Sequence, residues 1–263
     1  MPDHFATFRA LHTGPGLLVV ANAWDAGSAR LIASLGAAAI ATTSAGVAWS
    51  QGYRDGDALP LPLHLATLNS IVGAVDVPVS ADIEAGYAVQ PSAVAANVRR
   101  VVETGVVGIN IEDGDAAPEH LAEKIAAIRA VVGKSLFINA RTDIYLRDLA
   151  PGNAVAAVLA RAELYRAAGA DGIFVPGVTT PADIAALVAG IDAPLNVLAR
   201  PALPDAAALA ALGVRRLSAG STLALQAAAV TKGFAAGFLG GHFGTLFDTA
   251  LVYGDLNAMM RKG

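Results

Sequence analysis

Short apolar, β-branched runs alternate along this chain with alanine- and leucine-rich amphipathic stretches, and this alternation limits the fold more than any other feature. One run plus the next stretch takes roughly 20–35 residues, the length of one strand and one helix. The runs are nearly continuous in apolar residues, which indicates strands that are buried on both faces. The chain is therefore expected to form parallel strands wrapped in helices.

The alternation predicts eight strands, at 17–23, 38–43, 77–83, 107–112, 136–141, 171–176, 194–199 and 214–218. It predicts helices at 25–35, 63–75, 91–104, 118–132, 153–168, 181–189 and 205–212. Many of these stretches start at a proline or polar residue or end at a glycine, as helices do. Eight βα units in about 220 residues predict a closed (β/α)8 TIM-type barrel of the α/β class. The alternative is an open, doubly wound sheet.

Two further helical stretches, 221–240 and 245–261, follow the last predicted strand. A barrel needs only one helix there, so the second is surplus. Its apolar side chains would share one helical face: Leu246, Phe247, Ala250, Leu251 and Leu256. Because no linker or low-complexity stretch divides the chain, we take 1–263 as a single barrel domain and expect 221–263 to pack against another subunit.

Composition narrows the class of protein further. The 263 residues are 55% hydrophobic and 15% charged, as in a globular chain with a large core. The net charge of −4 gives no reason to expect a nucleic-acid or anionic-membrane partner. We see no apolar run of about 18 residues free of charges and turn signals, and no signal peptide, so we expect a cytoplasmic protein without a membrane span. Cysteine is absent, which excludes disulfides, thiolate metal sites and a catalytic thiol.

Three carboxylates stand at the ends of two neighbouring predicted strands: Asp82 and Glu84 in "VPVSADIEAGY", and Glu112 in "GINIED". In a barrel the chemistry lies where strands end at their C-terminal side. Asp82 and Glu84 are two residues apart, a spacing that on a strand points both side chains the same way. Three converging carboxylates repel one another unless a cation lies among them. Oxygen ligands without nearby His or Cys favour Mg²⁺ first and Mn²⁺ second.

A structural role is the alternative for these carboxylates, in which one pairs with Arg141 and the others cap helices. Arg141, in "NARTD", lies on the next strand. Its planar guanidinium could hold a substrate carboxylate by two hydrogen bonds, or could form a structural ion pair with Glu112 or Asp143.

Two segments near the predicted rim offer further polar groups. "TTSAG", 42–46, has a hydroxyl and backbone N–H groups that could bind an anion. Asp55 lies in a long predicted loop, 44–62, and loops over a barrel mouth are often functional. No His/Asp constellation lies near Ser44, which argues against a hydrolase triad. The five histidines are scattered, and neither a GxGxxG motif nor a P-loop is present.

These residues, in this order, resemble the isocitrate lyase and phosphoenolpyruvate mutase superfamily. The matching segments span 20–198 and are "ANAWDAGSARLIASLG", "ATTSAGVAWSQGYRDGD", "VPVSADIEAGY", "GINIED", "NARTD", "GADGIFVPG" and "PLNVL". The resemblance implies a (β/α)8 barrel. It also implies a homo-oligomer, either a dimer or a tetramer built from dimers that exchange a C-terminal helix. It also implies Mg²⁺, a small carboxylate substrate, and cleavage or formation of a C–C or P–C bond through an enolpyruvate-like intermediate.

The resemblance also implies roles for individual residues: catalytic for Arg141, Asp55 and Glu112, substrate-binding for Trp24, Ser44, Ala45, Gly46 and Asn196, and metal-binding for Asp82, Glu84 and Glu112. Arg141 would stabilise the developing enolate or a substrate carboxylate, and Asp55 would be the loop acid nearest the metal. A divalent ion and an arginine at a developing enolate would supply most of the stabilisation that such a reaction needs.

Two departures bear on the reaction. "IEDGDAAPEHLAEKI" lacks the cysteine that isocitrate and methylisocitrate lyases carry soon after this motif, and Gly114 stands where enzymes of phosphonates carry a lysine. Decarboxylation needs only the metal, an electron sink and a proton donor. We therefore expect a Mg²⁺-dependent lyase or decarboxylase of a small 2-oxo or 2-hydroxy dicarboxylate. The alternatives are P–C bond chemistry, with Arg54 and Lys124 as the nearest bases, and a barrel that binds a carboxylate without turnover.

Overall fold

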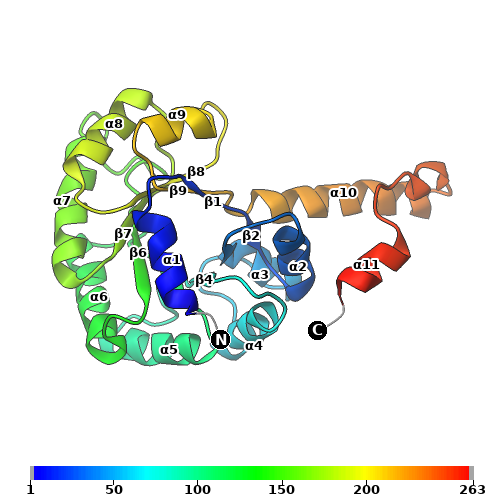
Figure 1. Cartoon of the computed structure of the whole chain (residues 1–263), viewed down its shortest axis with the longest axis horizontal. Coiled ribbons are helices and arrows are strands. Elements are labelled where there is room, and N and C mark those ends of the chain that lie inside the picture. Colours follow the sequence, from blue (N-terminus) through cyan, green and yellow to red (C-terminus); the bar gives the residue numbers. More distant parts are fainter. Residues whose placement is uncertain (1–2, 261–263) are drawn as a thin grey trace.

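The computed structural model describes residues 3–260, which form one ring of parallel strands surrounded by helices (Figure 1). The strands are β1 (Leu18–Val20), β2 (Asn22–Ala23), β3 (Ile40–Thr42), β4 (Val79–Asp82), β5 (Gly108–Glu112), β6 (Phe137–Arg141), β7 (Gly172–Val175), β8 (Leu195–Leu198) and β9 (Arg216–Ser218). Their order around the sheet is β1-β9-β8-β7-β6-β5-β4-β3-β2. β1 and β2 are two parts of one strand, interrupted at Ala21, so their pairings with β9 and β3 complete the ring. The predicted (β/α)8 barrel is confirmed.

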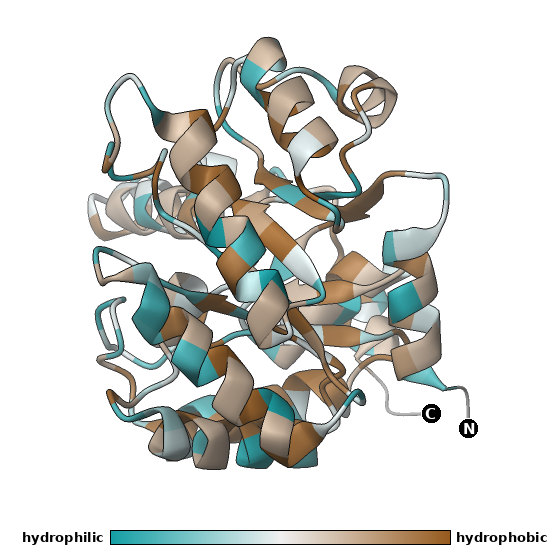
Figure 2. Cartoon of the chain, turned by 90° about the vertical axis from the view of Figure 1, so that its left-hand side faces the viewer, coloured by the Kyte–Doolittle hydropathy of each residue, from teal (hydrophilic) through white to brown (hydrophobic). Residues whose placement is uncertain are grey.

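The strands bury both faces, as the apolar runs predicted. Val79 and Ala81 of β4 belong to the main hydrophobic core between the strands and the helices. Ser80, between them, faces the barrel interior, where a Cβ on Gly108 would lie 3.2 Å from its hydroxyl. Figure 2 shows the consequence: the strands are largely hydrophobic, while the surrounding helices carry both hydrophobic and hydrophilic residues.

Seven helices follow the strands where the sequence predicts them, within a few residues: α2 (Ala26–Ser34), α4 (Leu61–Val72), α5 (Pro91–Glu103), α6 (Pro118–Val132), α7 (Ala154–Ala168), α8 (Pro181–Gly190) and α9 (Ala206–Ala211). α4, α5, α6 and α8 have proline in the first turn, where its missing N–H costs nothing. Asp25 caps α2 by accepting a hydrogen bond from the Ser28 N–H. Gly169 ends α7 in the left-handed conformation that favours glycine.

A helix that the sequence reading missed, α1 (His4–Thr13), closes the floor of the barrel (Figure 1). Phe8 is fully buried and meets Phe137 edge-on, with 5.6 Å between ring centroids. His12 stacks on the same ring at 4.2 Å, and burial lowers the pKa of His12 to about 3, so the imidazole is neutral. The floor is therefore packed with rings, with the buried Arg216 guanidinium 6.0 Å from the Phe8 ring centroid, and the carboxylates lie at the opposite mouth.

Two predicted segments differ from the structure. The expected loop 44–62 begins with a helix, α3 (Ser44–Ser50), because Thr43 caps its first turn through a hydrogen bond from the Gly46 N–H. The predicted helix 245–261 is instead a 3₁₀ turn, η1 (Gly244–Phe247), and a short helix, α11 (Tyr253–Met259). Between them the Thr249 hydroxyl bonds the backbone of Leu251 and competes with helix formation.

α10 (Thr222–Leu239) extends away from the barrel, and η1 and α11 turn back towards α2 (Figure 1). The Arg30 guanidinium donates to the Met259 carbonyl at 3.1 Å, which ties α11 to α2. In α10 only Ala224 is buried. α10 is long and apolar enough to cross a membrane by length and composition, although it contains Lys232, and core helices of soluble proteins also meet this test.

Candidate active site

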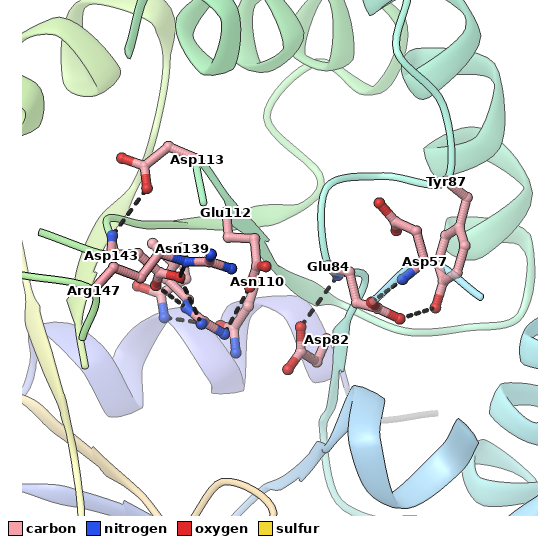
Figure 3. A network of polar contacts seen from close by, with 11 residues as sticks. Asp57, Asp82, Glu84, Tyr87, Asn110, Glu112, Asp113, Asn139, Asp143 and Arg147 are labelled. Atoms are coloured by element: carbon pink, nitrogen blue, oxygen red, sulfur yellow. Dashed lines mark hydrogen bonds and ion pairs between the residues drawn. The ribbon is translucent and has the colours of Figure 1, made fainter. Parts of the chain in front are cut away.

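The predicted site residues Asp82, Glu112 and Arg141 meet at the C-terminal rim of the barrel, because each ends its strand. Figure 3 shows Asp82 and Glu112 at this rim. Glu112 and Arg141 are partners in the β5–β6 register, and the Arg141 Nη1 lies 2.7 Å from the Glu112 Oε2. Asp82 lies on the other side of Glu112, opposite Asn110 in the β4–β5 register. Neighbouring parallel strands thus bring two carboxylates and a guanidinium together.

The prediction that Asp82 and Glu84 point the same way is wrong. β4 ends at Asp82, and Glu84 has a positive φ of 52°, so strand alternation no longer applies to it. Its carboxylate turns away from Glu112: Oε2 accepts a short hydrogen bond from the Asp57 N–H, and Oε1 accepts one from the Tyr87 hydroxyl at 3.4 Å (Figure 3). Glu84 therefore stands at the side of the rim rather than at its centre.

The three carboxyl groups share a dry environment that opposes their ionisation. Burial raises the pKa of Glu84 to about 7 and that of Glu112 to about 8, and it also raises the pKa of Asp82. Burial is the largest cause, and the nearby Asp55 carboxylate also raises the pKa values of Asp82 and Glu84. The rim thus gathers carboxyl groups whose ionisation the cations of this chain stabilise only in part.

The Arg141 guanidinium lies among these carboxylates at the rim. Its Nε and Nη2 donate to the two oxygens of Asp143 at 2.7 and 3.1 Å, while Nη1 pairs with Glu112. Both pairings that we had considered as structural alternatives are therefore present. Burial alone would lower the pKa of Arg141, but Glu112 and Asp143 outweigh it and raise the pKa. The guanidinium stays charged, and three of its five N–H groups are engaged.

The residues that support Glu84 were not predicted from the sequence. Asp57, Glu84 and Tyr87 all have positive φ, which costs energy in residues other than glycine and often marks functional sites. The Tyr87 hydroxyl also lies 3.3 Å from Nδ1 of the buried His64. Burial lowers the pKa of His64 to about 4, so this histidine is neutral. "GYRDGD" contains Asp57 as well as Asp55, but only Asp55 was among the predicted site residues.

Another buried carboxylate, Asp113, stabilises the rim through contacts with neighbouring elements. It accepts hydrogen bonds from the Arg161 Nη1 at 2.5 Å, the Tyr165 hydroxyl at 2.6 Å and the Asp143 N–H at 2.9 Å. Asp143, fully buried like Asp113, also accepts from the Arg147 Nε at 3.0 Å. These contacts hold the β6 end, and with it Arg141, in place.

The residues implied for substrate binding do not all meet. Ser44 lies at the start of α3, and its backbone N–H helps to lower the pKa of the Asp82 carboxyl. Trp24 and Gly46 line another cavity, against α10. Asn196 is buried and its Oδ1 accepts from Ser218 at 3.1 Å. Ala45 is buried in α3 beside Gly46, and the exposed Asp55 reaches the rim only through its charge. Ser44 and Asp55 thus influence the pKa of Asp82, while Trp24 and Gly46 line the cavity against α10.

A cavity of about 280 Å³ opens beside the rim. Its walls come from the loop before α4, the ends of β4 and β5, the start of α6 and the segment after β6: Gly56, Asp57, Glu84, Ala85, Glu112, Asp113, Gly114, Asp115, Ala116, His120, Leu121, Lys124 and Arg147. Within residues 3–260 no three His, Cys, Asp or Glu side chains lie close enough to form a ready-made metal cage. The predicted metal residues are therefore adjacent without being pre-assembled around one point.

Comparison with known proteins agrees with this arrangement. The phosphoenolpyruvate phosphomutase family model matches residues 8–239. An uncharacterised protein of Mycobacterium tuberculosis is 39% identical over 220 residues, 82% of each chain. An oxaloacetate decarboxylase of Pseudomonas fluorescens is 32% identical over 230 residues, 81% of this chain and 77% of its own. A structure from Burkholderia cenocepacia, provisionally assigned as a phosphonomutase, has a TM-score of 0.85 at 40% identity and covers 89% of this chain and all of its own.

The chain belongs to the phosphoenolpyruvate mutase family, within the isocitrate lyase and phosphoenolpyruvate mutase superfamily. The resemblance noted in the sequence is thereby confirmed, and the protein is an enzyme of the lyase and mutase type.

Proposed function

We propose that this protein is a Mg²⁺-dependent lyase or decarboxylase that cleaves a C–C bond of a small 2-oxo or 2-hydroxy dicarboxylate. The observation that carries the proposal is the rim of Asp82, Glu84 and Glu112, whose buried carboxyl groups have raised pKa values beside the charged guanidinium of Arg141. A site with more carboxyl groups than positive charges is stabilised most by a hard cation, which in turn can bind an anionic ligand.

The donor set fits Mg²⁺ in chemistry. All candidate ligands are carboxylate oxygens, and the three side chains do not converge closely enough to replace every water of the ion. Asp82 would hold the ion, and Glu84 and Glu112 would reach it through water. When bound, Mg²⁺ supplies Lewis acidity to the substrate oxygens. A phosphonopyruvate hydrolase with the same fold, 24% identical with a TM-score of 0.84, has been solved with oxalate and Mg²⁺, which supports the assignment by analogy.

The side chains present suit an enolate-forming reaction. Arg141 is held by Asp143 and keeps two N–H groups for a substrate oxygen on which negative charge develops. A preorganised donor of this kind stabilises the developing charge without reorienting during the reaction.

No observation favours P–C chemistry to the same degree. Lys124, one of the two bases nearest in sequence, donates its Nζ hydrogen bond to the Ala85 carbonyl at 2.9 Å, and Arg54 is exposed in the loop before α4. The loop 113–116 and Asp57 both line the cavity beside Glu112, so the short loop still brings polar groups to the rim.

We also propose that the enzyme is a homo-oligomer, a dimer or a tetramer, assembled through 221–263. The exposed apolar side chains of this arm support the proposal: Leu223, Leu225, Val230, Phe234, Phe238, Leu239, Phe243, Leu246, Phe247, Leu251, Val252, Tyr253, Leu256 and Met260. Apolar surface of this extent is uncommon on a monomer in water.

Calorimetric titration with Mg²⁺ and then oxalate tests the site. We expect oxalate to bind only after Mg²⁺, and Asp82→Asn to lose both events while its far-ultraviolet circular dichroism is unchanged. Arg166→Gln is the matched control, because Arg166 pairs with Asp192 at 2.6 Å on the far side of α7. Oxalate binding that is equally tight in EDTA would contradict the proposal.

A further inference from the structure

The cavity beside the rim contains a cation that the proposed reaction has not used. Arg147 lines this cavity together with Glu84 and Glu112, and its side chain is 48% exposed. Only its Nε is engaged, with Asp143 at 3.0 Å, and residues 3–260 offer no hydrogen-bond acceptor to either terminal nitrogen. An arginine anchored at one nitrogen presents the remaining N–H groups in a fixed plane, which suits two-point contact with a carboxylate.

Gly114 leaves the space in front of Arg147 open. Gly114 has a positive φ of 56°, and a Cβ built on it would lie 4.0 Å from the Arg147 Nη2. A longer side chain at 114 would therefore compete with the guanidinium for the cavity. Gly114 also stands where enzymes of phosphonates carry a lysine. The absence of a side chain at this position gives Arg147 access to the rim.

The other basic side chains of the cavity are less available. Lys124 is buried, and its Nζ is committed to the Ala85 carbonyl. His120 lies 4.0 Å from the Glu123 carboxylate. The lining also contains Asp57 and Asp115, so a ligand group with two negative charges would meet repulsion from several sides. A singly charged, planar carboxylate fits this balance better than a phosphonyl group.

We propose that Arg147 binds the distal carboxylate of the substrate in this cavity, and that the preferred reaction is C2–C3 cleavage of a 2-hydroxy dicarboxylate. This inference rests on the proposed function, since it requires the other end of the substrate to bind at Asp82 and Arg141. It goes further by selecting one of the two C–C reactions.

The direction in which charge moves distinguishes C2–C3 cleavage from decarboxylation. In C2–C3 cleavage the 2-hydroxyl loses its proton, a C2=O bond forms, and the C2–C3 electron pair moves to C3 and into the distal carboxylate. That carboxylate gains charge until C3 takes up a proton, and the proton balance closes without a co-reactant. In decarboxylation the C3–C4 pair moves towards the 2-oxo oxygen, and the distal carboxylate leaves as neutral CO₂. A fixed guanidinium stabilises the first transition state and opposes the second.

Kinetics of Arg147→Gln on 2,3-dimethylmalate, 2-methylisocitrate and oxaloacetate test the inference. For the 2-hydroxy substrate that is cleaved, we expect kcat/KM to fall about tenfold. This is the lower end of the effects expected when a hydrogen bond to a charged group is lost, because Arg147 is half-exposed. For oxaloacetate, KM should rise while kcat is unchanged or higher. Arg147→Lys should recover part of the loss, and Arg166→Gln should change neither substrate.

Ligand binding separates this inference from the proposed function. With Mg²⁺, Arg147→Gln should weaken 3,3-difluorooxaloacetate about tenfold and leave oxalate, which has no distal group, within about twofold. Oxalate that does not bind the natural protein would refute the proposed function itself. Normal oxalate binding with equal affinity of both proteins for difluorooxaloacetate, or an equal fall in kcat for cleavage and decarboxylation, would overturn the role of Arg147.

Discussion

Glu84→Gln offers a sharp test of whether the rim is built for a cation. In the metal-free protein the Glu84 carboxyl is 4% exposed, and burial raises its pKa from 4.5 to about 7. Each pKa unit corresponds to about 1.4 kcal/mol, so ionising this group in the folded state costs about 3 kcal/mol at pH 8. The glutamine amide has the same shape and can accept from the Asp57 N–H while donating to the Tyr87 oxygen.

The sign of the effect follows from linkage. A carboxyl whose folded pKa lies above its unfolded pKa contributes stability below pH 4.5 that is lost as pH rises through about 7. Glu84→Gln removes this loss, so the metal-free variant should melt roughly 6–12 °C higher than the parent at pH 8. Near pH 5 the two proteins should melt at similar temperatures.

Differential scanning calorimetry in EDTA at pH 5 and pH 8 measures this, with Glu123→Gln on the exposed face of α6 as the charge-matched control. A variant that is less stable than the parent at pH 8 would refute the reasoning, because it would show that the ionised Glu84 carboxylate holds the fold together.

Three further predictions follow from the same geometry. Asp82→Asn should abolish Mg²⁺-dependent turnover yet keep or raise the melting temperature in EDTA; a large drop measured by calorimetry would assign Asp82 to the scaffold. Arg141→Met should abolish activity and also destabilise the protein, since it leaves the fully buried Asp143 carboxylate with only Arg147, and urea unfolding would reveal a loss of about 3 kcal/mol or more. Phe8→Ala should cost about 3–5 kcal/mol in urea unfolding, because it empties the barrel floor while leaving the rim untouched, so an unchanged midpoint would contradict the packing described for α1.

The barrel was predictable because burial on both faces leaves a clear trace in each strand. Val79 and Ala81 face the helices while Ser80 and Asp82 face the interior, and such short runs repeat at a spacing that admits few folds. α1 was missed because its amphipathic pattern is short and its burial depends on Phe137, far along the chain. Local pattern cannot show a contact of that range.

The site was predictable in composition and only partly in arrangement. Strand ends identified Asp82, Glu112 and Arg141, and all three meet. The strand rule failed at Glu84, because a positive φ turns its side chain aside, and sequence gives no sign of that in a residue other than glycine. Arg147 is four residues from Asp143, an ordinary spacing for an ion pair, and only the fold shows that it faces the cavity.

Pyruvate release tests the central claim most directly. The protein would be incubated with oxaloacetate, 2,3-dimethylmalate, 2-methylisocitrate or phosphonopyruvate, with Mg²⁺ or with EDTA, and products would be identified by proton and phosphorus NMR. We predict Mg²⁺-dependent pyruvate from at least one of oxaloacetate, 2,3-dimethylmalate and 2-methylisocitrate, lost in EDTA and in Asp82→Asn. Release that is insensitive to EDTA, release from phosphonopyruvate alone, or no release from any substrate while Mg²⁺ binds would contradict the assignment as a C–C lyase.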